Sequence, residues 1–390
     1  MSYPSTNEAR PEESRRDPDQ LRSMIEAWLG GRPGVNGATV TDVVIPESNG
    51  MSSETVLVEA SWGEGEGEGE SERGSGEATD ARLVFRIAPS DGAVPVFENY
   101  DLESQFRVMA DVARLSEVPV PKVLWLELDP DPIGSQFFVM ERSDGQVPPD
   151  VMPYNFGDNF LFDASPDDRD RLEFNSVKVL SELHAIADPV RSFSYLDGAD
   201  ASTDVSNGDA FLRAHVARSR HYYDWVIRDG LPSPLLERGF RWLEDNWPKD
   251  VDSPVLSWGD ARIGNMMFRD FEPVAVLDWE MASVAPREVD LSWIIFLHQF
   301  FEDIAQVMEL PGMPDFMQRD RVVARYVELT GYEPRDMDFY VLYSALQHGI
   351  IMSQVQRRAI RFGASEMPED IDDMILHRAL LTSLIDGRTG

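Results

Sequence analysis

The fold of this chain is decided by the stretch Leu256-Ser-Trp-Gly-Asp-Ala-Arg-Ile-Gly-Asn-Met-Met-Phe268, which is followed by Val274-Ala-Val-Leu-Asp-Trp-Glu280. Residues 266–268 and 274–277 are apolar runs of strand length, and residues 269–273 between them carry the polar and proline signals of a turn. The pattern predicts two antiparallel strands, and we expect Phe268 to pair with Ala275.

This hairpin is expected to bring polar side chains together at its open end. Asn265 and Asp278 would lie there on neighbouring strands, where opposed Cβ atoms are about 5 Å apart. An amide oxygen and a carboxylate at that separation can hold Mg²⁺, which takes oxygen ligands and leaves positions free for substrate phosphates. Asp260 precedes the hairpin by a tight, glycine-containing loop. We therefore expect a phosphoryl-transfer centre, with Asn265 and Asp278 as metal ligands and Asp260 as the catalytic general base.

The same residues carry a family resemblance. The Asp-x-x-x-x-Asn spacing of Asp260 and Asn265 resembles the catalytic loop of kinases, with Asp278 in the place of the metal-binding Asp that follows. The sequence of these motifs is similar to that of the aminoglycoside phosphotransferase and choline kinase-like family. The similarity is to bacterial members in particular, which resemble the kinase-like domain of acyl-CoA dehydrogenase family proteins. The similar motif order runs from about residue 36 to about residue 360.

The resemblance implies an α+β, bilobal protein-kinase-like fold. Its small N-terminal lobe would contain an antiparallel sheet, and its larger C-terminal lobe would be mainly helical. We expect a disordered tail at 1–16, a nucleotide-binding lobe at 17–142 with a flexible Gly-Glu insertion at 63–80, and a catalytic and substrate-binding lobe at 143–390. The length agrees with two or three units, at about 100–200 residues per domain.

One residue departs from the family pattern. The family usually has His two residues before the catalytic Asp, and this chain has Trp258. An indole N–H is also a hydrogen-bond donor, so catalysis is compatible with the change. The alternative is a buried Trp in a loop that has lost its activity.

The N-terminal lobe carries the first nucleotide-binding candidates. Asp17 as N-cap and Pro18 at the first helical position predict a helix that ends at Gly30. Strands are expected at 39–45 and 54–60. Backbone N–H groups of the small, polar loop between them can form an anion-binding concavity. Its candidates for the nucleotide phosphates are Ser48, Gly50, Ser52 and Ser53, and the alternative is an ordinary hairpin turn.

Further candidates follow in the same lobe. Residues 82–87 alternate as a half-buried strand, with Leu83, Phe85 and Ile87 on one face. The resemblance makes Arg86 the phosphate-contacting cation and Glu103, on a helix from residue 101, its ion-pair partner. The alternative is two surface residues that never meet. Residues 136–141 are expected to form a buried strand, and the family resemblance implies that backbone groups around Glu141 and Arg142 contact adenine.

The larger lobe is expected to be mainly helical, with apolar stripes at 172–184, 209–247 and 318–385. Within the first stripe, His184 is interpreted as a packed or capping histidine. Asp290 matches a recurrent family Asp that braces the catalytic loop, so we assign it a structural role.

Composition excludes several classes. The chain has no cysteine, which excludes disulfides, thiolate metal sites and a Cys nucleophile. A net charge of −35 opposes nucleic acid and anionic lipid, whereas polycations would be attracted. We find neither a signal peptide nor an apolar run of membrane-spanning length, and expect a cytoplasmic protein.

The leading hypothesis is an ATP-dependent phosphotransferase that transfers the γ-phosphate to a hydroxyl of a small molecule, such as an aminoglycoside-like compound. ATP with Mg²⁺ would lie between the lobes. The alternative is a catalytically impaired, nucleotide-binding pseudokinase or scaffold, against which the retained trio of Asp260, Asn265 and Asp278 argues. A protein kinase is disfavoured, because the chain lacks a recognisable activation segment between Asp278 and the region of Pro286.

Overall fold

The computed structural model describes residues 16–46, 53–64, 79–89, 94–196, 204 and 206–387. The chain divides into two compact units. Residues 12–110 and 121–143 form one, here called the sheet unit, and residues 1–11, 111–120 and 144–390 form the other, here called the helical unit. The lobe boundary at residue 142 stays a prediction.

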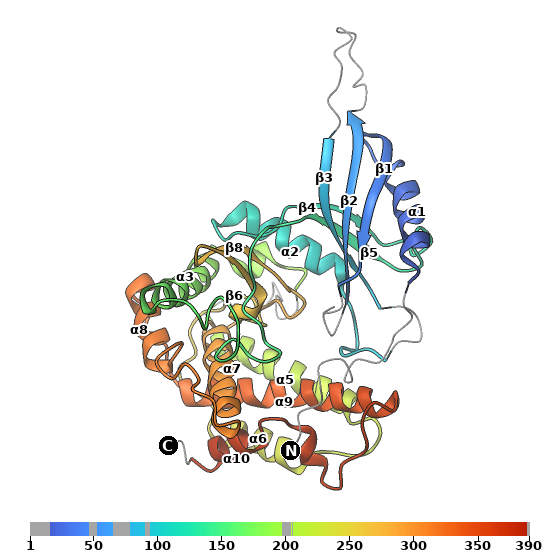
Figure 1. Ribbon diagram of the computed structural model, residues 1–390. Coiled ribbons are helices and arrows are strands. Elements are labelled where there is room, and N and C mark those ends of the chain that lie inside the picture. The colour runs from blue at the N-terminus through green and yellow to red at the C-terminus, as the bar shows by residue number, and fades with distance from the viewer. Residues whose placement is uncertain are drawn as a thin grey trace. The chain divides into compact units, whose positions relative to one another are not determined.

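The sheet unit contains a five-stranded antiparallel sheet with the order β1-β2-β3-β5-β4 (Figure 1). Its strands are β1 (Val35–Val44), β2 (Glu54–Glu64), β3 (Thr79–Ile87), β4 (Val123–Glu127) and β5 (Phe137–Glu141). In the middle of the sheet, Phe85 of β3 pairs with Val56 on one side and with Val139 on the other. The predicted strand at 82–87 and the predicted buried strand before Glu141 are confirmed.

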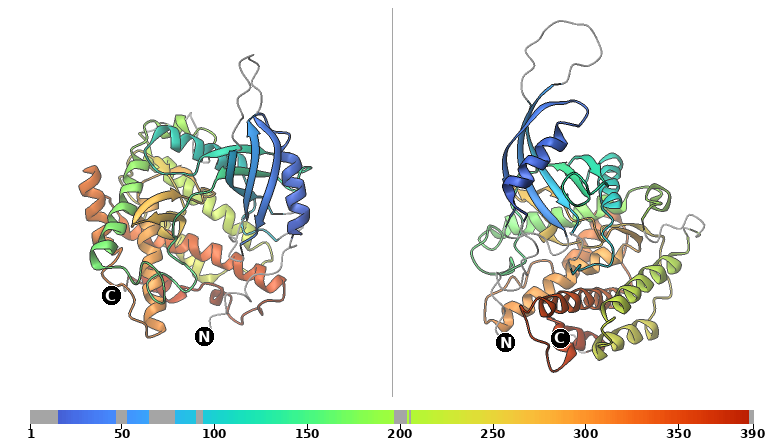
Figure 2. Two further views of the ribbon diagram at one scale, coloured as in Figure 1. Left: turned by 45° about the horizontal axis from the view of Figure 1, so that its top comes forward. Right: turned by 90° about the vertical axis from the view of Figure 1, so that its right-hand side faces the viewer.

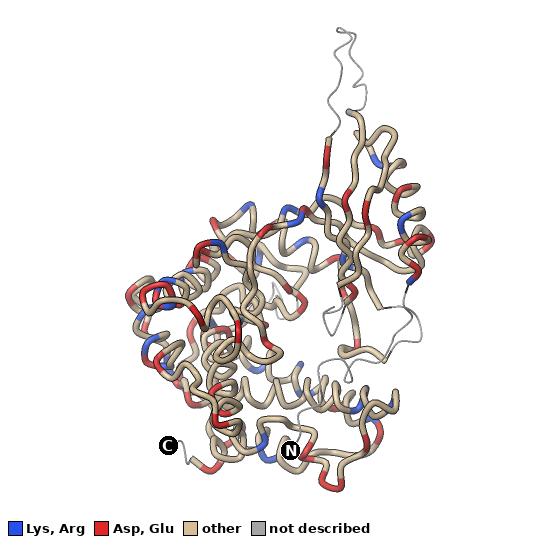
Figure 3. Tube along the Cα trace, viewed as in Figure 1, with Lys and Arg blue, Asp and Glu red and all other residues tan. Residues whose placement is uncertain are grey.

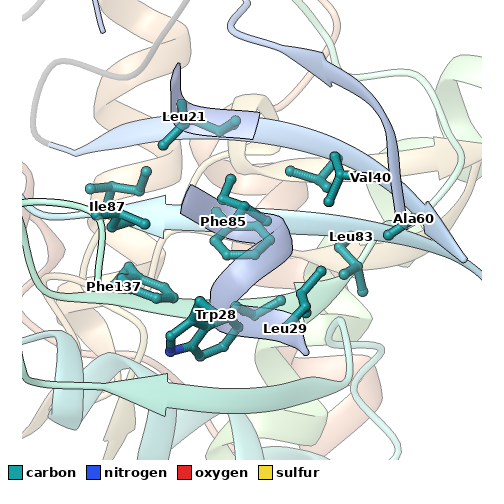
Figure 4. Packing of buried hydrophobic residues seen from close by; sticks show 14 of the residues in the cluster. Leu21, Trp28, Leu29, Val40, Ala60, Leu83, Phe85, Ile87 and Phe137 are labelled. Atoms are coloured by element: carbon teal, nitrogen blue, oxygen red, sulfur yellow. The ribbon is translucent and has the colours of Figure 1, made fainter. Parts of the chain in front are cut away.

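Helix α1 (Pro18–Leu29) covers one face of this sheet. It begins where the sequence predicts, because the side chain of Asp17 accepts hydrogen bonds from the backbone N–H groups of Asp19 and Gln20. Trp28 packs edge-on against Phe137, with ring centroids 4.8 Å apart. The resulting apolar core also contains the predicted inner face of β3 (Figure 4). Its labelled members are Leu21, Trp28, Leu29, Val40, Ala60, Leu83, Phe85, Ile87 and Phe137.

Two expectations for this unit need correction. Arg16, placed in the disordered tail, forms an ion pair with Glu54 at 3.0 Å and donates a hydrogen bond to Ser135 Oγ at 2.8 Å. The insertion is also shorter than 63–80, since β2 and β3 continue into it and Trp62 pairs with Thr79. Cross-strand pairing therefore extends through flanking residues whose composition alone is typical of a loop.

The helical unit has the mainly helical character that the sequence predicts (Figure 2). Its larger elements are α3 (Pro166–His184), α5 (Gly208–Val226), α6 (Pro234–Asp245), α7 (Glu288–Val307), α8 (Arg319–Thr330), α9 (Met337–Arg361) and α10 (Arg378–Ile385). Short elements are α4 (Pro189–Ser192) and the single turns η1 (Ile263–Asn265) and η2 (Ile371–Met374). Helix α9 is contacted by α5, α6, α7 and α10, and most of its side chains are buried.

Two small antiparallel pairs in this unit position the site: β6 (Val255–Ser257) with β9 (Ser283–Ala285), and β7 (Met266–Arg269) with β8 (Glu272–Val276). Helix α2 (Leu102–Leu115) contains the division between the units. The α+β, kinase-like fold class is confirmed. Within the described ranges, no helix is both long and apolar enough to cross a membrane. Acidic residues are spread along the chain in both units (Figure 3).

Candidate active site

The β7–β8 hairpin forms as predicted, but in a different register. Met267, and not Phe268, lies opposite Ala275, while Phe268 pairs with Pro273. The reversal uses only Asp270 and Phe271, both at positive φ, so the turn is shorter than the five residues expected. A register shift between Met267 and Phe268 then leaves Val274 outside the pairing. At the open end, Leu277 and not Asp278 lies opposite Asn265, because Leu277 N–H donates to Asn265 O at 2.8 Å; Asp278 follows one residue later.

The loop between β6 and η1 is held by one buried carboxylate. Asp290 accepts hydrogen bonds from the backbone N–H groups of Trp258 at 2.8 Å and Gly259 at 2.9 Å, and from Ser257 Oγ at 2.7 Å. His184 Nε2 lies 3.0 Å from the same carboxylate. Asp290 is fully buried in the first turn of α7. The structural roles assigned to Asp290 and to the packed His184 are confirmed.

Trp258 links this loop to the segment after β8 that carries Asp278. Its indole N–H donates to the backbone carbonyls of Leu277 at 3.0 Å and Asp278 at 3.3 Å, and its side chain is fully buried. The residue that departs from the family pattern is therefore a structural hydrogen-bond donor inside the loop.

Two glycines allow the loop its close approaches. Gly259 has a φ of +88°, and a Cβ there would lie 2.3 Å from Met281 O. A Cβ on Gly264 would lie 2.3 Å from a carboxylate oxygen of Asp150. Both distances are shorter than real Cβ contacts, so larger side chains would displace the loop.

The carboxylate of Asp260 is surrounded by donors. Asn265 Nδ2 donates to Oδ2 at 2.7 Å, and Trp293 Nε1 donates to Oδ1 at 2.7 Å. Arg262 Nε lies 3.0 Å from both oxygens. The side chain retains 15% of its exposure. These contacts fix the orientation of the carboxylate and leave it a route to the surface.

Opposing forces set the proton affinity of Asp260. Burial, followed by the negative charge of Asp278, raises its pKa to about 7. The hydrogen bonds from Asn265 and Trp293 act in the opposite direction, because they stabilise the ionised form. A carboxyl group with a pKa near neutrality can both accept and release a proton at physiological pH.

Asn265 and Asp278 carry amide and carboxylate oxygens, the donor types that Mg²⁺ prefers, and their role as metal ligands stays a prediction. The amide nitrogen of Asn265 donates to the backbone oxygen of Asp260 at 3.2 Å and to Asp260 Oδ2 at 2.7 Å. The amide oxygen of Asn265 therefore points away from Asp260. Asp278 has a φ of +59°, a left-handed conformation that non-glycine residues rarely adopt. Among the residues with described coordinates, no group of three or more His, Asp or Glu could hold a metal ion. Two protein oxygens would leave further positions for phosphate and water.

Three further residues at this site were not singled out from the sequence. Arg262 joins Asp260 to Asp150, with which it also forms an ion pair. Burial lowers the pKa of Arg262, while the charges of Asp278 and Glu280 raise it. Trp293 follows Asp290 by three positions on α7, a spacing that places both on one helix face. That spacing was the available signal, whereas Asp150 is too distant in sequence to give one.

The predicted nucleotide-binding residues belong to the sheet unit. Ser48, Gly50 and Ser52 lie outside the described residues, and Ser53 is buried. Arg86 donates to Thr55 Oγ1 at 2.8 Å. Glu103 forms an ion pair with Arg107 on its own helix at 3.8 Å. The pairing of Arg86 with Glu103 stays a prediction.

The backbone N–H groups at the predicted adenine contact already take part in hydrogen bonds. The backbone N–H of Glu141 donates to Lys122 O at 2.9 Å, and that of Arg142 donates to Arg82 O at 2.8 Å. The Glu141 side chain pairs with Lys122 Nζ at 3.0 Å. Both amide hydrogens are therefore used within the unit, and a base at this position would need other backbone groups as donors.

A kinase-like fold that places an Asp–Asn pair beside a second Asp defines the class of kinase-like phosphotransferases. The chain belongs to the Phosphotransferase enzyme family, which it matches over residues 69–360.

Solved structures with this fold include a Ralstonia eutropha protein assigned to the aminoglycoside phosphotransferases. It has a TM-score of 0.63 and 19% identity, over 94% of this chain and 97% of that chain. A second is the GDP complex of aminoglycoside 2'-phosphotransferase-IIIa, with a TM-score of 0.55 and 13% identity, over 96% of this chain and 100% of that chain.

Curated relatives confirm the expected resemblance to acyl-CoA dehydrogenase family proteins. A protein assigned as acyl-CoA dehydrogenase IBR3 of Arabidopsis thaliana is 25% identical over 332 residues, which cover 81% of this chain and 36% of that protein. Acyl-CoA dehydrogenase family member 11 of Gallus gallus is 29% identical over 177 residues, covering 45% of this chain and 20% of that protein. The chain thus spans about a third or less of these relatives.

Proposed function

We propose that this protein transfers the γ-phosphate of ATP to a hydroxyl group of a small molecule, with Mg²⁺ held by Asn265 and Asp278. The observation that carries the proposal is the 2.7 Å contact between Asn265 and Asp260, at the hairpin end from which Asp278 follows. One assigned metal ligand is thereby in direct contact with the assigned base.

In this mechanism, Asp260 orients the acceptor hydroxyl and takes its proton. The hydroxyl oxygen forms a bond to the γ-phosphorus, the bond from phosphorus to the β,γ-bridging oxygen breaks, and ADP leaves. Bound Mg²⁺ would neutralise charge on the phosphate oxygens. Positioning and electrostatic stabilisation would supply most of the rate enhancement, and proton transfer about 10²–10⁴-fold.

Arg262 would keep Asp260 in place until the acceptor arrives. Its guanidinium pairs with Asp260 and Asp150, so rotation of the assigned base would break an ion pair. Ser48, Gly50, Ser52, Ser53, Arg86, Glu103, Glu141 and Arg142 remain the proposed nucleotide-binding residues.

Solved neighbours support a nucleotide and a small acceptor. Structures with this fold include a complex of aminoglycoside phosphotransferase APH(4)-Ia with AMP-PNP and hygromycin B, at a TM-score of 0.52 and 14% identity. Those ligands belong to that protein. For this chain, we propose an acceptor from the broader class of hydroxyl compounds, to which aminoglycosides belong.

A pseudokinase is the second candidate, and it is disfavoured because the contacts around Asp260 are intact. The test is release of ADP from Mg-ATP, with GTP in parallel, across a library of alcohols, sugars and aminoglycosides. We expect ADP release that depends on one acceptor class and is lost in Asp260→Asn. Nucleotide binding without acceptor-dependent turnover would instead support the pseudokinase.

A further inference from the structure

Two histidines form a contact beside the catalytic loop, within the helical unit. His348 lies on α9, and His377 immediately precedes α10. Their Nδ1 atoms are 3.3 Å apart. Both rings pack against Phe296 and Phe300, with centroid distances between 5.1 and 5.5 Å. The mechanism above assigns no role to either histidine.

The hydrogen bonds determine which nitrogen carries each proton. His377 Nε2 lies 2.7 Å from the backbone oxygen of Ala345, which can only accept, so this nitrogen is protonated. Burial lowers the pKa of both rings, that of His377 to about 4, so both are neutral. His377 Nδ1 is then unprotonated and accepts from His348 Nδ1. Each neutral ring has one proton, which leaves His348 Nε2 as an unprotonated acceptor.

This nitrogen is available to a ligand. Within the described part of the chain, His348 Nε2 has no hydrogen-bond partner, and it is not among the buried polar atoms that lack one. His377, by contrast, is 3% exposed and occupied at both nitrogens. In this pair, the buried His377 has both nitrogens in hydrogen bonds, whereas His348 presents an accessible, accepting Nε2.

The ring of His348 is one residue, Trp293, removed from the assigned base. The ring of His348 contacts the ring of Trp293 edge-on, with centroids 6.2 Å apart. Trp293 in turn donates to Asp260 at 2.7 Å. The charge of Arg262 also acts on His348 and opposes its protonation. A molecule with a hydroxyl on Asp260 could thus reach His348 with a second polar group.

We propose that His348 Nε2 is a specificity-determining contact, which accepts a hydrogen bond from a second hydroxyl or ammonium group of the phosphoryl acceptor. The inference rests on the proposed function. It selects diols, sugars and amino alcohols over simple alcohols, because a donor must face the unprotonated nitrogen. His377 acts as a positioning residue, since it fixes the proton of His348 on Nδ1.

The tautomer is tested first, on the full chain labelled with ¹⁵N-histidine and without ligand. Two-bond ¹H–¹⁵N spectra should show His348 protonated on Nδ1 and His377 on Nε2, with the His348→Gln spectrum assigning the signals. In His377→Leu, the His348 signal should lose its Nδ1 preference. A proton on Nε2 of His348 in the unmodified chain would overturn the inference.

The acceptor contact is tested by a matched pair of variants. In His348→Gln, the side-chain oxygen can take the place of Nε2, whereas the shorter His348→Asn reaches only the place of Nδ1. The measured quantity is the ratio of kcat/KM for a diol or amino alcohol to that for the matched mono-alcohol. This ratio should fall about tenfold in His348→Asn through KM and be largely retained in His348→Gln.

Failure of the inference differs from failure of the proposed function. If the unmodified protein transferred no phosphoryl group to the diol, the amino alcohol or the mono-alcohol, the proposed function would be contradicted. Transfer with the same ratio in both His348 variants would contradict only the role of His348. His221→Asn, which changes an exposed histidine of α5 in the same way, is the control and should leave the ratio unchanged.

Discussion

At the residue scale, Asp260 and its donors define the chemistry. The assignment of Asp260, Asn265 and Asp278 came from spacing, and the structure gives each a distinct environment. Asp260 accepts hydrogen bonds from the amide of Asn265 and the indole of Trp293, while Asp278 has a left-handed backbone conformation. Spacing could not have found Asp150, because its contact depends on how distant segments pack, whereas Trp293 follows Asp290 by three positions on one helix.

The two Asp residues should fail in different ways when replaced. Asp260→Ala should lower single-turnover phosphoryl transfer by about 10²–10⁴-fold and leave nucleotide affinity nearly unchanged, because the proton acceptor is lost and the metal ligands remain. Asp278→Ala should also weaken Mg²⁺-dependent nucleotide binding, measured by calorimetry. Normal transfer by Asp260→Ala would show that the base is misassigned.

The pKa of Asp260 gives a prediction for the metal-free protein. With a pKa of about 7, this carboxyl is protonated below neutrality and ionised above it. The unfolded chain ionises near 3.8, so the free energy of unfolding should fall as pH rises from about 4 to 7. Asp260→Asn should remove that part of the fall, as measured by denaturant titration at each pH.

Addition of Mg-nucleotide should reverse this effect, because a cation beside the carboxylate favours its ionised form. The titration midpoint of ¹³C-labelled Asp260 should then move to lower pH. An unchanged midpoint would place the cation elsewhere.

At the element scale, α7 holds the catalytic loop at two points, through Asp290 to the backbone and through Trp293 to Asp260. The role of Asp290 could be inferred from the family resemblance. The existence of the hairpin was predictable, but its register and the residue opposite Asn265 were not. The turn places Phe271 at positive φ, a conformation for which its sequence gives no signal.

Asp290→Ala should strongly destabilise the protein. It leaves the N–H groups of Trp258 and Gly259 and the hydroxyl of Ser257 buried without an acceptor, at about 1–3 kcal/mol for each unsatisfied group. Thermal unfolding should show the loss. Ser292→Ala, which removes a buried polar contact from the same helix but none from the loop, should cost much less.

Gly259→Ala isolates the steric requirement of the loop. Gly230 has a similar φ of +82° with no atom near its missing Cβ, so Gly230→Ala measures the backbone cost alone, about 1–2 kcal/mol. Gly259→Ala should cost more and should reduce activity, because Met281 O blocks the new methyl group. Equal losses of stability would show that the loop relaxes freely.

At the scale of the whole molecule, the fold class was predicted well because the family resemblance implies it, while hydrophobic periodicity located individual strands and helices. The prediction failed at edges. Arg16 follows a charged, polar segment, yet three acceptors from Glu54, Ile133 and Ser135 hold its guanidinium. Such long-range contacts leave no local pattern.

The net charge of −35 predicts a salt-dependent stability. Repulsion among acidic groups opposes the compact state, and salt screens it over a Debye length of about 10 Å at 0.1 M. The melting temperature should therefore rise with NaCl between low and moderate ionic strength. Sucrose at equal osmolality is the control for effects unrelated to charge. A flat response to NaCl would show that surface ion pairs already compensate the repulsion.

The indole hydrogen bond of Trp293 has a practical consequence. A tryptophan whose N–H is held by a carboxylate changes its emission when that carboxylate is neutralised or turned. The chain has nine tryptophans, so Trp293→Phe identifies the contribution of this one. The protein therefore carries a built-in optical reporter, with which arrival of a cation or an alcohol can be followed in real time without any attached dye.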